Sequence, residues 1–475
     1  MKKFLPLGAL LLLCTMGLHA QKKKNDVIKD LDSKSEKYSE IAHEIWGLAE
    51  MGYQEEQSSA LLQKTLSDAG FSIETGIADI PTAFKAEFGS GYPVIGILGE
   101  YDALPGLSQE AVPEKKSAGG EAGHACGHHL FGTASTAAAI SVKDWMEANN
   151  IKGTIRFYGC PAEEGGSGKV YMVREGVFDD VDVALHWHPS SGNAASAGAA
   201  LANKSAKFRF HGVSAHAAGA PEKGRSALDG VEAMNAMVNM MREHVPEDAR
   251  IHYVITNGGK APNVVPDFAE VYYYARHNTR DVVVDIFDRM VKAAEGAAMG
   301  TGTTMEYEMI GGTHELLPNL TVQKVMYDNL VKVGGVTYNE EEKAFAEEIS
   351  ETLGKDAPDI ASAEKIQPYK ETAQAYGSTD VGDVSYTVPT AGLGTATWVP
   401  GTPAHSWQAV AAGGMSIGSK GMMVAAKTIA LTAMDIFENP KTVEAAKKEL
   451  EERRGKDFKY VPMLGNRPPA LDYRK

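Results

Sequence analysis

Cysteine is scarce in this chain, which has 3 cysteines among 475 residues. Basic residues are also in deficit, because 47 Lys and Arg face 62 Asp and Glu, and the formal net charge is −15. This balance argues against a nucleic-acid partner or an anionic membrane surface, since either needs a basic face. Internal repeats and low-complexity tracts are absent, and 475 residues suffice for two or three domains with cores of their own.

Long apolar runs are missing as well. The run from Leu5 to Met16 is too short to span a bilayer. It follows two lysines and precedes Leu18-His19-Ala20, so residues 1–20 are predicted to be a secretory signal, with export most simply to a bacterial periplasm. A lipoprotein signal ending at Cys14 is the alternative, which a large leucine before that cysteine disfavours. No membrane association is expected after cleavage.

The most informative stretch that the chain does contain is Gly123-His124-Ala125-Cys126-Gly127-His128-His129. Cys126 and His128 are two positions apart, so both side chains can turn toward one centre on an irregular backbone. A thiolate and an imidazole suit zinc, manganese or another first-row divalent ion. The alternative is a buried cysteine beside a histidine that is no ligand. A disulfide between Cys126 and Cys160 is possible after export, but a metal on Cys126 would prevent it.

The first part of the chain alternates apolar runs with helical patterns. Expected strands at 93–98, 154–158 and 181–185 surround an expected helix at 130–146. This alternation predicts an α/β fold with a mostly parallel sheet, in which functional residues gather at the carboxyl ends of the strands. The candidates that stand where strands stop are Asp102, Cys126, Glu163, Glu164 and His188.

A second pattern begins near residue 201 and ends near residue 311. Its order, β-α-β-β-α-β, predicts a ferredoxin-like α+β domain inserted into the first domain. The expected division is therefore a signal peptide at 1–20 and a catalytic domain built from 21–200 and 312–475, with the inserted domain at 201–311. The elements expected in the insert are strands at 206–210, 251–256, 270–276 and 304–310 and helices at 227–242 and 282–298.

Adjacent carboxylates occur at Glu163 and Glu164, between a proline and two glycines. Because adjacent side chains diverge, one carboxylate can bind a metal while the other moves a proton from water to the leaving amine, as a two-metal hydrolase requires. A solvated surface pair is the ordinary alternative. His405, in the loop after the apolar run 391–399, becomes a ligand candidate because two metals need more than four protein ligands.

Segments spread in order over nearly the whole mature chain resemble the M20 metallopeptidases and amidohydrolases. The likeness is to the branch with a cysteine ligand, and within it to the aminobenzoyl-glutamate utilisation protein B subgroup. The segments are Gly99–Gly106, Gly123–His129, Pro161–Gly166, His186–Pro189, Gly212–Ala218, Asn263–Asp267, Gly377–Ser385 and Pro403–Ser406.

The resemblance implies two divalent metal ions per subunit, manganese or zinc, with Cys126 as the bridging ligand and Glu163 as the general base. It leaves a choice between His186 and His188, and a count of six residues from Asp182 favours His188. The implied ligands are Cys126, His128, Glu164, His188 and His405.

The resemblance also implies that the inserted domain is a lid and a dimerisation module. His216 would reach an active site, often that of the partner subunit, and stabilise the oxyanion of the tetrahedral intermediate. Asn263 and Arg276 would bind the substrate. For Arg276 the alternative, given equal weight, is a charge at a strand edge with no role in binding.

Three positions near the motifs need comment. His129 stands where the branch has Asp or Asn, and it is expected to orient a neighbouring ligand. Glu100 is left out of the ligand set because the cysteine branch does not use that position. Asp102 is expected to orient part of the site.

The sequence therefore predicts a secreted dinuclear amidohydrolase that cleaves N-acyl or N-aroyl amino acids, with p-aminobenzoyl-glutamate-type conjugates as the leading candidate. A metallo-dipeptidase or an N-acyl-amino-acid deacylase on the same scaffold is the alternative. A periplasmic binding protein without catalysis is the rival from another class. Expected partners are a small-molecule substrate, a second copy of the chain through the lid, and in some cases a related subunit.

Overall fold

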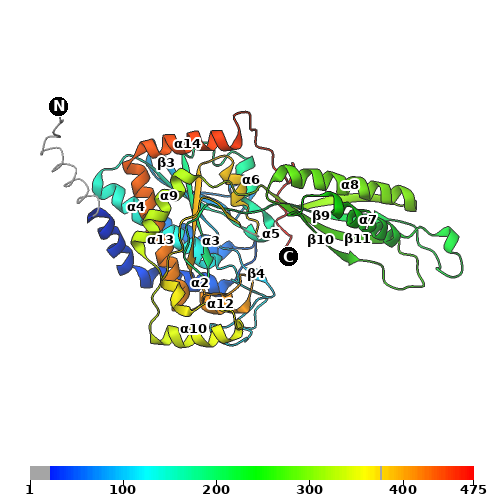
Figure 1. Cartoon of the computed structure of the whole chain (residues 1–475), viewed down its shortest axis with the longest axis horizontal. Helices are drawn as coiled ribbons and strands as arrows, with labels where there is room; N and C mark the ends of the chain where they lie inside the picture. The colour runs from blue at the N-terminus through cyan, green and yellow to red at the C-terminus, as the bar shows by residue number, and fades with distance from the viewer. Residues whose placement is uncertain (1–21, 375–376) are drawn as a thin grey trace, which may run out of the picture.

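The computed structural model describes residues 22–374 and 377–475. It consists of a helix-covered sheet and an elongated arm that projects from one side of it (Figure 1). The predicted signal segment, with Cys14, lies outside the described residues. Among the helices that the structure does describe, none has the length and apolarity required to cross a membrane.

The larger sheet has six strands in the order β1-β2-β6-β3-β7-β14. The four strands from β6 to β14 run parallel, and β1 and β2 form an antiparallel edge. The prediction of a mostly parallel α/β sheet is therefore confirmed. The strands are β1 (Ser72–Thr75), β2 (Phe84–Ser90), β3 (Val94–Gly99), β6 (Gly153–Gly159), β7 (Val183–Ser190) and β14 (Thr390–Ala396).

Helices bury both faces of this sheet. On one face α4 (His128–Asn149) packs against β3 and against α13 (Ser416–Glu438), and small side chains along α4 let these elements approach closely. On the other face α6 (Gly168–Arg174) and α11 (Val381–Ser385) join a second apolar cluster. Other helices that cover the sheet or lie beside it are α2 (Ser35–Leu48), α3 (Glu56–Asp68), α5 (Glu163–Gly166), α9 (Leu320–Val333), α10 (Glu340–Thr352), α12 (Trp407–Gly413) and α14 (Pro440–Arg454).

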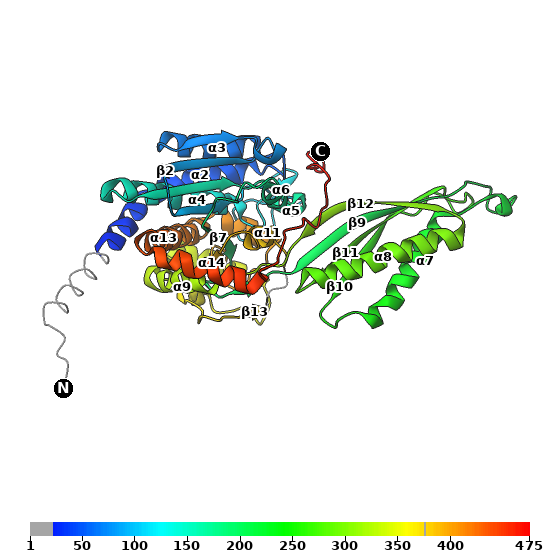
Figure 2. The same cartoon turned by 90° about the horizontal axis from the view of Figure 1, so that it is seen from above.

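The arm is a four-stranded antiparallel sheet in the order β10-β11-β9-β12, with two helices packed on it (Figure 2). Its buried residues form a cluster separate from the cores of the larger sheet. The predicted β-α-β-β-α-β order is confirmed. The elements are β9 (Ala202–His211), α7 (Ala227–Met241), β10 (Arg250–Asn257), β11 (Phe268–His277), α8 (Arg280–Thr301) and β12 (Thr304–Thr313).

Four strands are only two residues long and lie outside both main sheets. β8 pairs with β13 in parallel, and β4 pairs with β5 antiparallel. They are β4 (Leu104–Pro105), β5 (Ala122–Gly123), β8 (Gly198–Ala199) and β13 (Ala373–Gln374).

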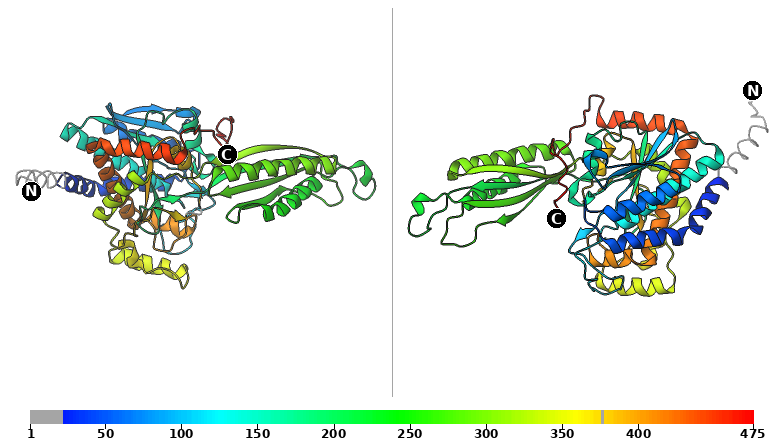
Figure 3. Two further views of the ribbon diagram at one scale, coloured as in Figure 1. Left: turned by 45° about the horizontal axis from the view of Figure 1, so that its top comes forward. Right: turned by 180° about the vertical axis from the view of Figure 1, so that it is seen from behind.

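Residues 456–475 form a strap that leaves α14 and crosses the junction between the larger sheet and the arm (Figure 3). The Tyr460 hydroxyl donates to Oδ1 of Asp383 at 2.7 Å, and Nε2 of His314 donates to the Val461 carbonyl at 3.0 Å. Met463 belongs to the apolar cluster of the arm. The strap thus contacts both parts of the molecule.

Asp383 provides a test of this junction. Burial raises the pKa of its carboxyl to about 7, although Tyr460 and the His314 amide donate to it. The carboxyl of an unfolded Asp has a pKa of ~3.9. Between that pKa and the pKa of the folded state, the folded protein holds a proton on Asp383 that the unfolded protein has lost. The stability that this bound proton contributes is therefore lost as pH rises through 7. Asn does not titrate, so Asp383→Asn avoids this loss. Between pH 4 and pH 8 its free energy of unfolding should rise relative to that of the wild type by up to about 4 kcal/mol. Urea denaturation at both pH values measures this, and a constant difference contradicts it.

Candidate metal centre

The predicted metal-site residues converge at the carboxyl ends of β3, β6 and β7, where the arm joins the larger sheet. A cavity of about 610 Å³ lies there. The residues that line it come from both parts of the molecule, among them Cys126, Glu163, Glu164, His188, Arg276 and His405. The site is therefore an open pocket whose floor is the sheet and whose far wall is the base of the arm.

Three sets of side chains have ligand atoms within 4.8 Å of one another, among the residues that the structure describes. Two of the sets share Cys126, which is the arrangement that a bridging ligand requires. The third set brings Glu163 beside His128. The sets are Cys126, His128 and His188; Cys126, Glu164 and His405; and Glu100, His128 and Glu163.

Asp102 orients two of these groups. Its Oδ1 lies 2.7 Å from Nδ1 of His128, and its Oδ2 accepts from the Glu164 amide at 2.8 Å. The opposite nitrogen, Nε2 of His128, faces Glu100, and His128 lies in the same ligand set as Cys126 and His188. Burial raises the pKa of the Asp102 carboxyl, but the charge of His128 and the bonds from His128 and Glu164 more than reverse that effect, so the pKa is lowered. Asp102 therefore holds the site together as an ionised group.

The backbone after β6 separates the two adjacent carboxylates. Ala162, Gly165 and Ser167 have φ values of 55°, 90° and 60°, so the chain turns sharply and no regular helix begins. Oε1 of Glu164 consequently faces Nε2 of His405 at 3.1 Å, whereas Glu163 faces Glu100 and His128. The Glu164 carboxylate therefore lies in a candidate ligand set with Cys126, whereas the Glu163 carboxylate points in a different direction.

His188 and His186 both line the cavity, but their nearest partners differ. Strand β7 extends five residues beyond the expected end at 185, so both histidines lie inside the strand and on the same face. Nε2 of His188 lies 3.3 Å from Sγ of Cys126, and its Nδ1 donates to the Pro189 carbonyl at 2.7 Å. His186 belongs to none of the ligand sets found among the described residues. It packs against Gly392 of β14 instead.

Sequence reasoning missed a buried charge network behind these residues. Oε2 of Glu100 lies 3.1 Å from Nε2 of His128, and its Oε1 lies 2.6 Å from Nζ of Lys169. Lys169 also contacts Asp380 at 2.8 Å, and all of these side chains are buried. Glu100 had a signal, since a carboxylate directly after a buried strand is costly without a partner. Nothing in the sequence around Lys169 marks it.

The residues present fit divalent ions. Zinc accepts sulfur, imidazole nitrogen and carboxylate oxygen, and the carboxylate oxygens also suit manganese. Nε2 of His128, Oε1 of Glu164 and both oxygens of Glu100 are buried and make no hydrogen bond of normal geometry, although charged groups face them. Burial, together with the charges of Glu100 and Glu164, raises the pKa of Glu163 well above its usual range. Such a surplus of buried negative charge is what bound cations offset.

His129 does not orient a ligand, contrary to the sequence-based expectation. Its ring lies on the first turn of α4 and turns away from the cavity, where Nε2 donates to the Gly413 carbonyl at 3.1 Å. The ring also packs against His124, with centroids 4.8 Å apart.

Cys126 and Cys160 are both free and buried, and Cys160 donates weakly to the Tyr158 carbonyl.

The structure divides the predicted substrate residues into two groups. Arg276, near the base of the arm, lines the cavity, and its buried Nε makes no hydrogen bond. His216 and Asn263 lie together at the opposite end, beyond the distal ends of β9 and β11, where the Asn263 carbonyl accepts from the Ala217 amide at 3.0 Å. Neither residue lines the metal cavity of its own chain.

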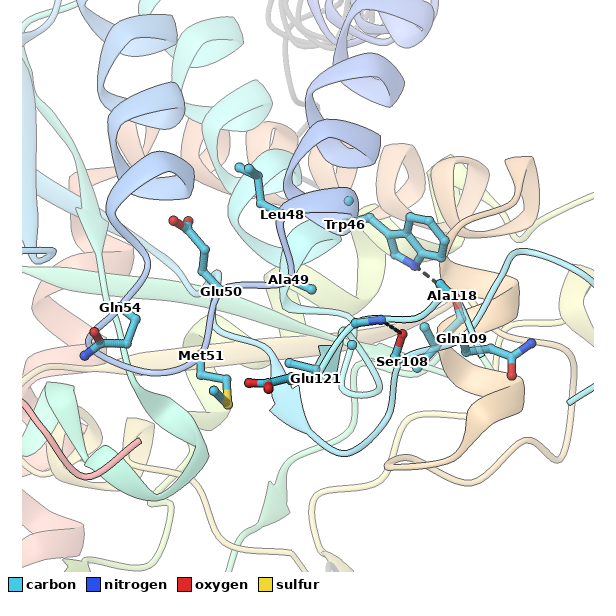
Figure 4. A pocket seen from close by; sticks show the side chains of 15 residues that line it. Trp46, Leu48, Ala49, Glu50, Met51, Gln54, Ser108, Gln109, Ala118 and Glu121 are labelled. Carbon is cyan, nitrogen blue, oxygen red and sulfur yellow. Dashed lines mark hydrogen bonds between the residues drawn. The ribbon is translucent and has the colours of Figure 1, made fainter. Parts of the chain in front are cut away.

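A second cavity, of about 380 Å³, lies between the end of α2 and the loop before β5 (Figure 4). Trp46 forms one wall and donates to the Val410 carbonyl at 3.1 Å, and Glu50 and Glu121 are its charged residues. The ligand sets found among the described residues include no member of this cavity. The chemistry therefore belongs to the cavity at the strand ends.

Comparison with known proteins identifies the family. The chain is 43% identical to one of the subunits of the p-aminobenzoyl-glutamate hydrolase of Escherichia coli over 467 residues, which cover 93% of this chain and 97% of that protein. The chain belongs to the M20 family. A model of the M20 peptidase dimerisation domain matches residues 202–326, which contain the whole arm. The predicted resemblance is confirmed.

Further M20-type proteins show how far the likeness extends. The Xaa-Arg dipeptidase of Mus musculus is 28% identical, with 90% of this chain and 92% of that protein covered. The crystal structure of a dinuclear metal-binding M20 peptidase from Bacillus subtilis superposes with a TM-score of 0.59 at 17% identity, covering 86% of this chain and 99% of that chain. This M20 member is accordingly a metal-dependent amidohydrolase or peptidase.

Replacement of each histidine of β7 tests the ligand assignment. His188→Ala removes the imidazole beside Cys126 and should weaken the affinity for at least one metal ion by about 100-fold or more. His186→Ala is the matched control, since it empties a similar volume on the same strand and should retain the full metal content. Titration with a chelating dye and elemental analysis measure both. Metal loss in His186→Ala alone contradicts the assignment.

Proposed function

We propose that this protein hydrolyses the amide bond of N-acyl or N-aroyl amino acids, with p-aminobenzoyl-glutamate-type conjugates as its leading substrates. The observation that carries the proposal is the convergence of two ligand sets on Cys126 beside a separate, half-buried carboxylate, Glu163, at the floor of one cavity. The identity to a component of a p-aminobenzoyl-glutamate hydrolase supports the substrate class.

The proposed metal content is two divalent ions per subunit, zinc or manganese. Cys126 would be shared between them, with His128 and His188 on one side and Glu164 and His405 on the other, as the two sets suggest. Bound there, the ions would supply Lewis acidity to the amide carbonyl and to the attacking water. Asp102 fixes the ring of His128 and the backbone of Glu164, so it sets the spacing of ligands on both sides.

Glu163 is the proposed general base. It carries no ligand atom in either set that contains Cys126, so its carboxylate is free to hold a proton between two steps. It would take a proton from the attacking water and deliver it to the nitrogen of the leaving amino acid. Glu100 faces Glu163 and is itself paired with Lys169, so this ion pair determines the charge next to the proposed base.

Arg276 is the proposed anchor for the substrate carboxylate. Its guanidinium lies 5.1 Å over the ring of Tyr274, which fixes its plane at the wall of the cavity. A half-buried guanidinium whose Nε is buried and unpartnered is suited to a carboxylate, since that pair forms parallel charge-assisted hydrogen bonds. Free amino acids and dipeptides also carry this carboxylate, so Arg276 does not by itself separate a hydrolase of acyl conjugates from a dipeptidase.

The arm is proposed to serve as lid and dimerisation module, with residues 201–311 as the insert and residues 21–200 and 312–475 as the catalytic domain. His216 and Asn263 lie at the far end of the arm and would act on the site of a second copy, where His216 would stabilise the oxyanion and Asn263 would bind substrate. A homodimer follows from this placement. Because the Escherichia coli relative is itself named as one subunit of a hydrolase, a related partner subunit is supported as well.

Export to a periplasm is proposed from residues 1–20 alone.

Glu163→Gln tests the catalytic assignment. The amide keeps the shape of the side chain but accepts no proton, so kcat should fall by about 1000-fold while the metal content stays unchanged. Turnover of p-aminobenzoyl-glutamate with added manganese or zinc measures kcat, and Glu164→Gln should instead lose metal. A wild type that binds the conjugate but never cleaves it, or a Glu163→Gln enzyme with full kcat, contradicts the proposal.

A substrate panel tests the role of Arg276. Arg276→Met should raise KM about 100-fold for conjugates with a free carboxylate, because one charged contact is lost from a desolvated site. The same conjugates with the carboxylate amidated are the matched control and should bind both proteins equally weakly. Dipeptides in the panel separate the dipeptidase alternative. An equal KM for the acid in both proteins contradicts the assignment.

A further inference from the structure

The strap brings two side chains from the far end of the sequence to the metal centre. The Tyr473 hydroxyl and Nη2 of Arg474 both donate to the main-chain carbonyl of Glu164, each at 2.9 Å. Glu164 is one of the residues of the ligand sets, and the carbonyl belongs to the sharp turn that separates it from Glu163. A segment more than 300 residues away in sequence therefore binds the backbone of the candidate catalytic loop.

This backbone needs donors from elsewhere. With φ of −71° and ψ of 68°, Glu164 departs from helical geometry, and Gly165 follows at a φ of 90°. The carbonyls of such a turn do not continue a helical ladder, and a buried carbonyl without a donor costs free energy comparable to a lost hydrogen bond. The neighbouring groups follow the same pattern, because Asp102 accepts from the Glu164 amide and the Tyr53 hydroxyl donates to the Gly166 carbonyl at 2.7 Å.

The space around Tyr473 is shaped for its hydroxyl. The rings of Tyr53 and Tyr473 meet edge to face with centroids 5.6 Å apart, and a Cβ added to Gly52 would overlap the Tyr473 hydroxyl. Gln54 donates to the Leu471 carbonyl at 2.9 Å, which holds the strap just before Tyr473. The guanidinium of Arg474 stacks on the ring of Tyr473 at 4.8 Å. The two donors are thus held against each other and against the turn that precedes α3.

We propose that Tyr473 and Arg474 are positioning residues that set the placement of Glu163 and Glu164 by binding the Glu164 carbonyl. The inference rests on the proposed function for its kinetic consequence, but its consequence for metal affinity does not. Loss of a donor lets the turn relax, so the Glu164 carboxylate would no longer be held at the distance from Cys126 that the second ligand set shows. A residue that orients a ligand acts on metal affinity, and a shift of the general base acts on kcat.

The test uses the full chain with three substitutions. Tyr473→Phe removes only the hydroxyl, Arg474→Met keeps most of the stem, and Arg474→Lys retains one donor. Titration of the metal-free protein with zinc or manganese in the presence of a chelating dye should show about 10-fold weaker binding for Phe and Met and partial recovery for Lys. In the same proteins kcat should fall about 10-fold with KM unchanged, while the melting temperature stays within a few degrees of the wild type.

Arg174→Met is the matched control. Arg174 donates to the Arg467 carbonyl at 2.7 Å and so holds the strap without touching Glu164. This variant should keep the metal affinity and kcat of the wild type. Unchanged metal affinity and kcat in both Tyr473→Phe and Arg474→Met overturns the proposal, as does an equal loss in Arg174→Met, which would make the strap a general stabiliser. If wild type cleaves no amide but the titration still separates the variants, the proposed function fails and the positioning role stands.

Discussion

The arrangement of this protein depends on negative charge that is buried at the ends of parallel strands. Several carboxylates face one cavity, and Lys169 is the amino group that contacts two of them. In a folded chain such a surplus is expensive unless cations balance it. The thiol and the imidazoles beside it are the groups that bind such cations, so the demand for charge and the means to meet it lie in the same place. The carboxylates that line the cavity are the buried Glu100 and Asp380 and the half-buried Glu163 and Glu164, and the buried Asp102 lies beside them.

The sequence predicted the fold well because its periodicities are local. Apolar runs and helical spacing carry the strands and helices, and the sheet brings strand ends together by topology alone. Cys126, Glu163 and Glu164 became candidates for the same reason, since each follows an expected strand, whereas the full ligand set came from the family resemblance. Lys169 and the strap were missed because they depend on contacts between distant segments, which no local pattern records, whereas Glu100 had a local signal and was left out because the cysteine branch does not use that position. The expected role of His129 was wrong because one turn of helix aims that ring toward Gly413 rather than toward the cavity.

The length of the arm explains why residues that the family resemblance assigns to the substrate lie far apart within one chain. Its apolar core is separate from the cores of the larger sheet, with Met463 of the strap as one member. Strands β9 and β11 run its full length and carry Arg276 at the base and His216 beyond the tip. His216, at the far end of the arm, does not line the metal cavity of its own chain, whereas Arg276 does. The two ends can serve the same kind of site only if they serve different copies of it, which makes dimerisation part of the proposed chemistry.

The strap shows what a sharply turned catalytic loop requires of the rest of the fold. Separation of adjacent carboxylates demands a turn with left-handed residues, and such a turn leaves its own amides and carbonyls without regular partners. Here side chains from the loop after β3, from the turn before α3 and from the strap supply them: Asp102, Tyr53, Tyr473 and Arg474. The same strap contacts the junction of the arm through Tyr460 and Met463. Backbone geometry at the ligands and the position of the arm are therefore held by one continuous segment.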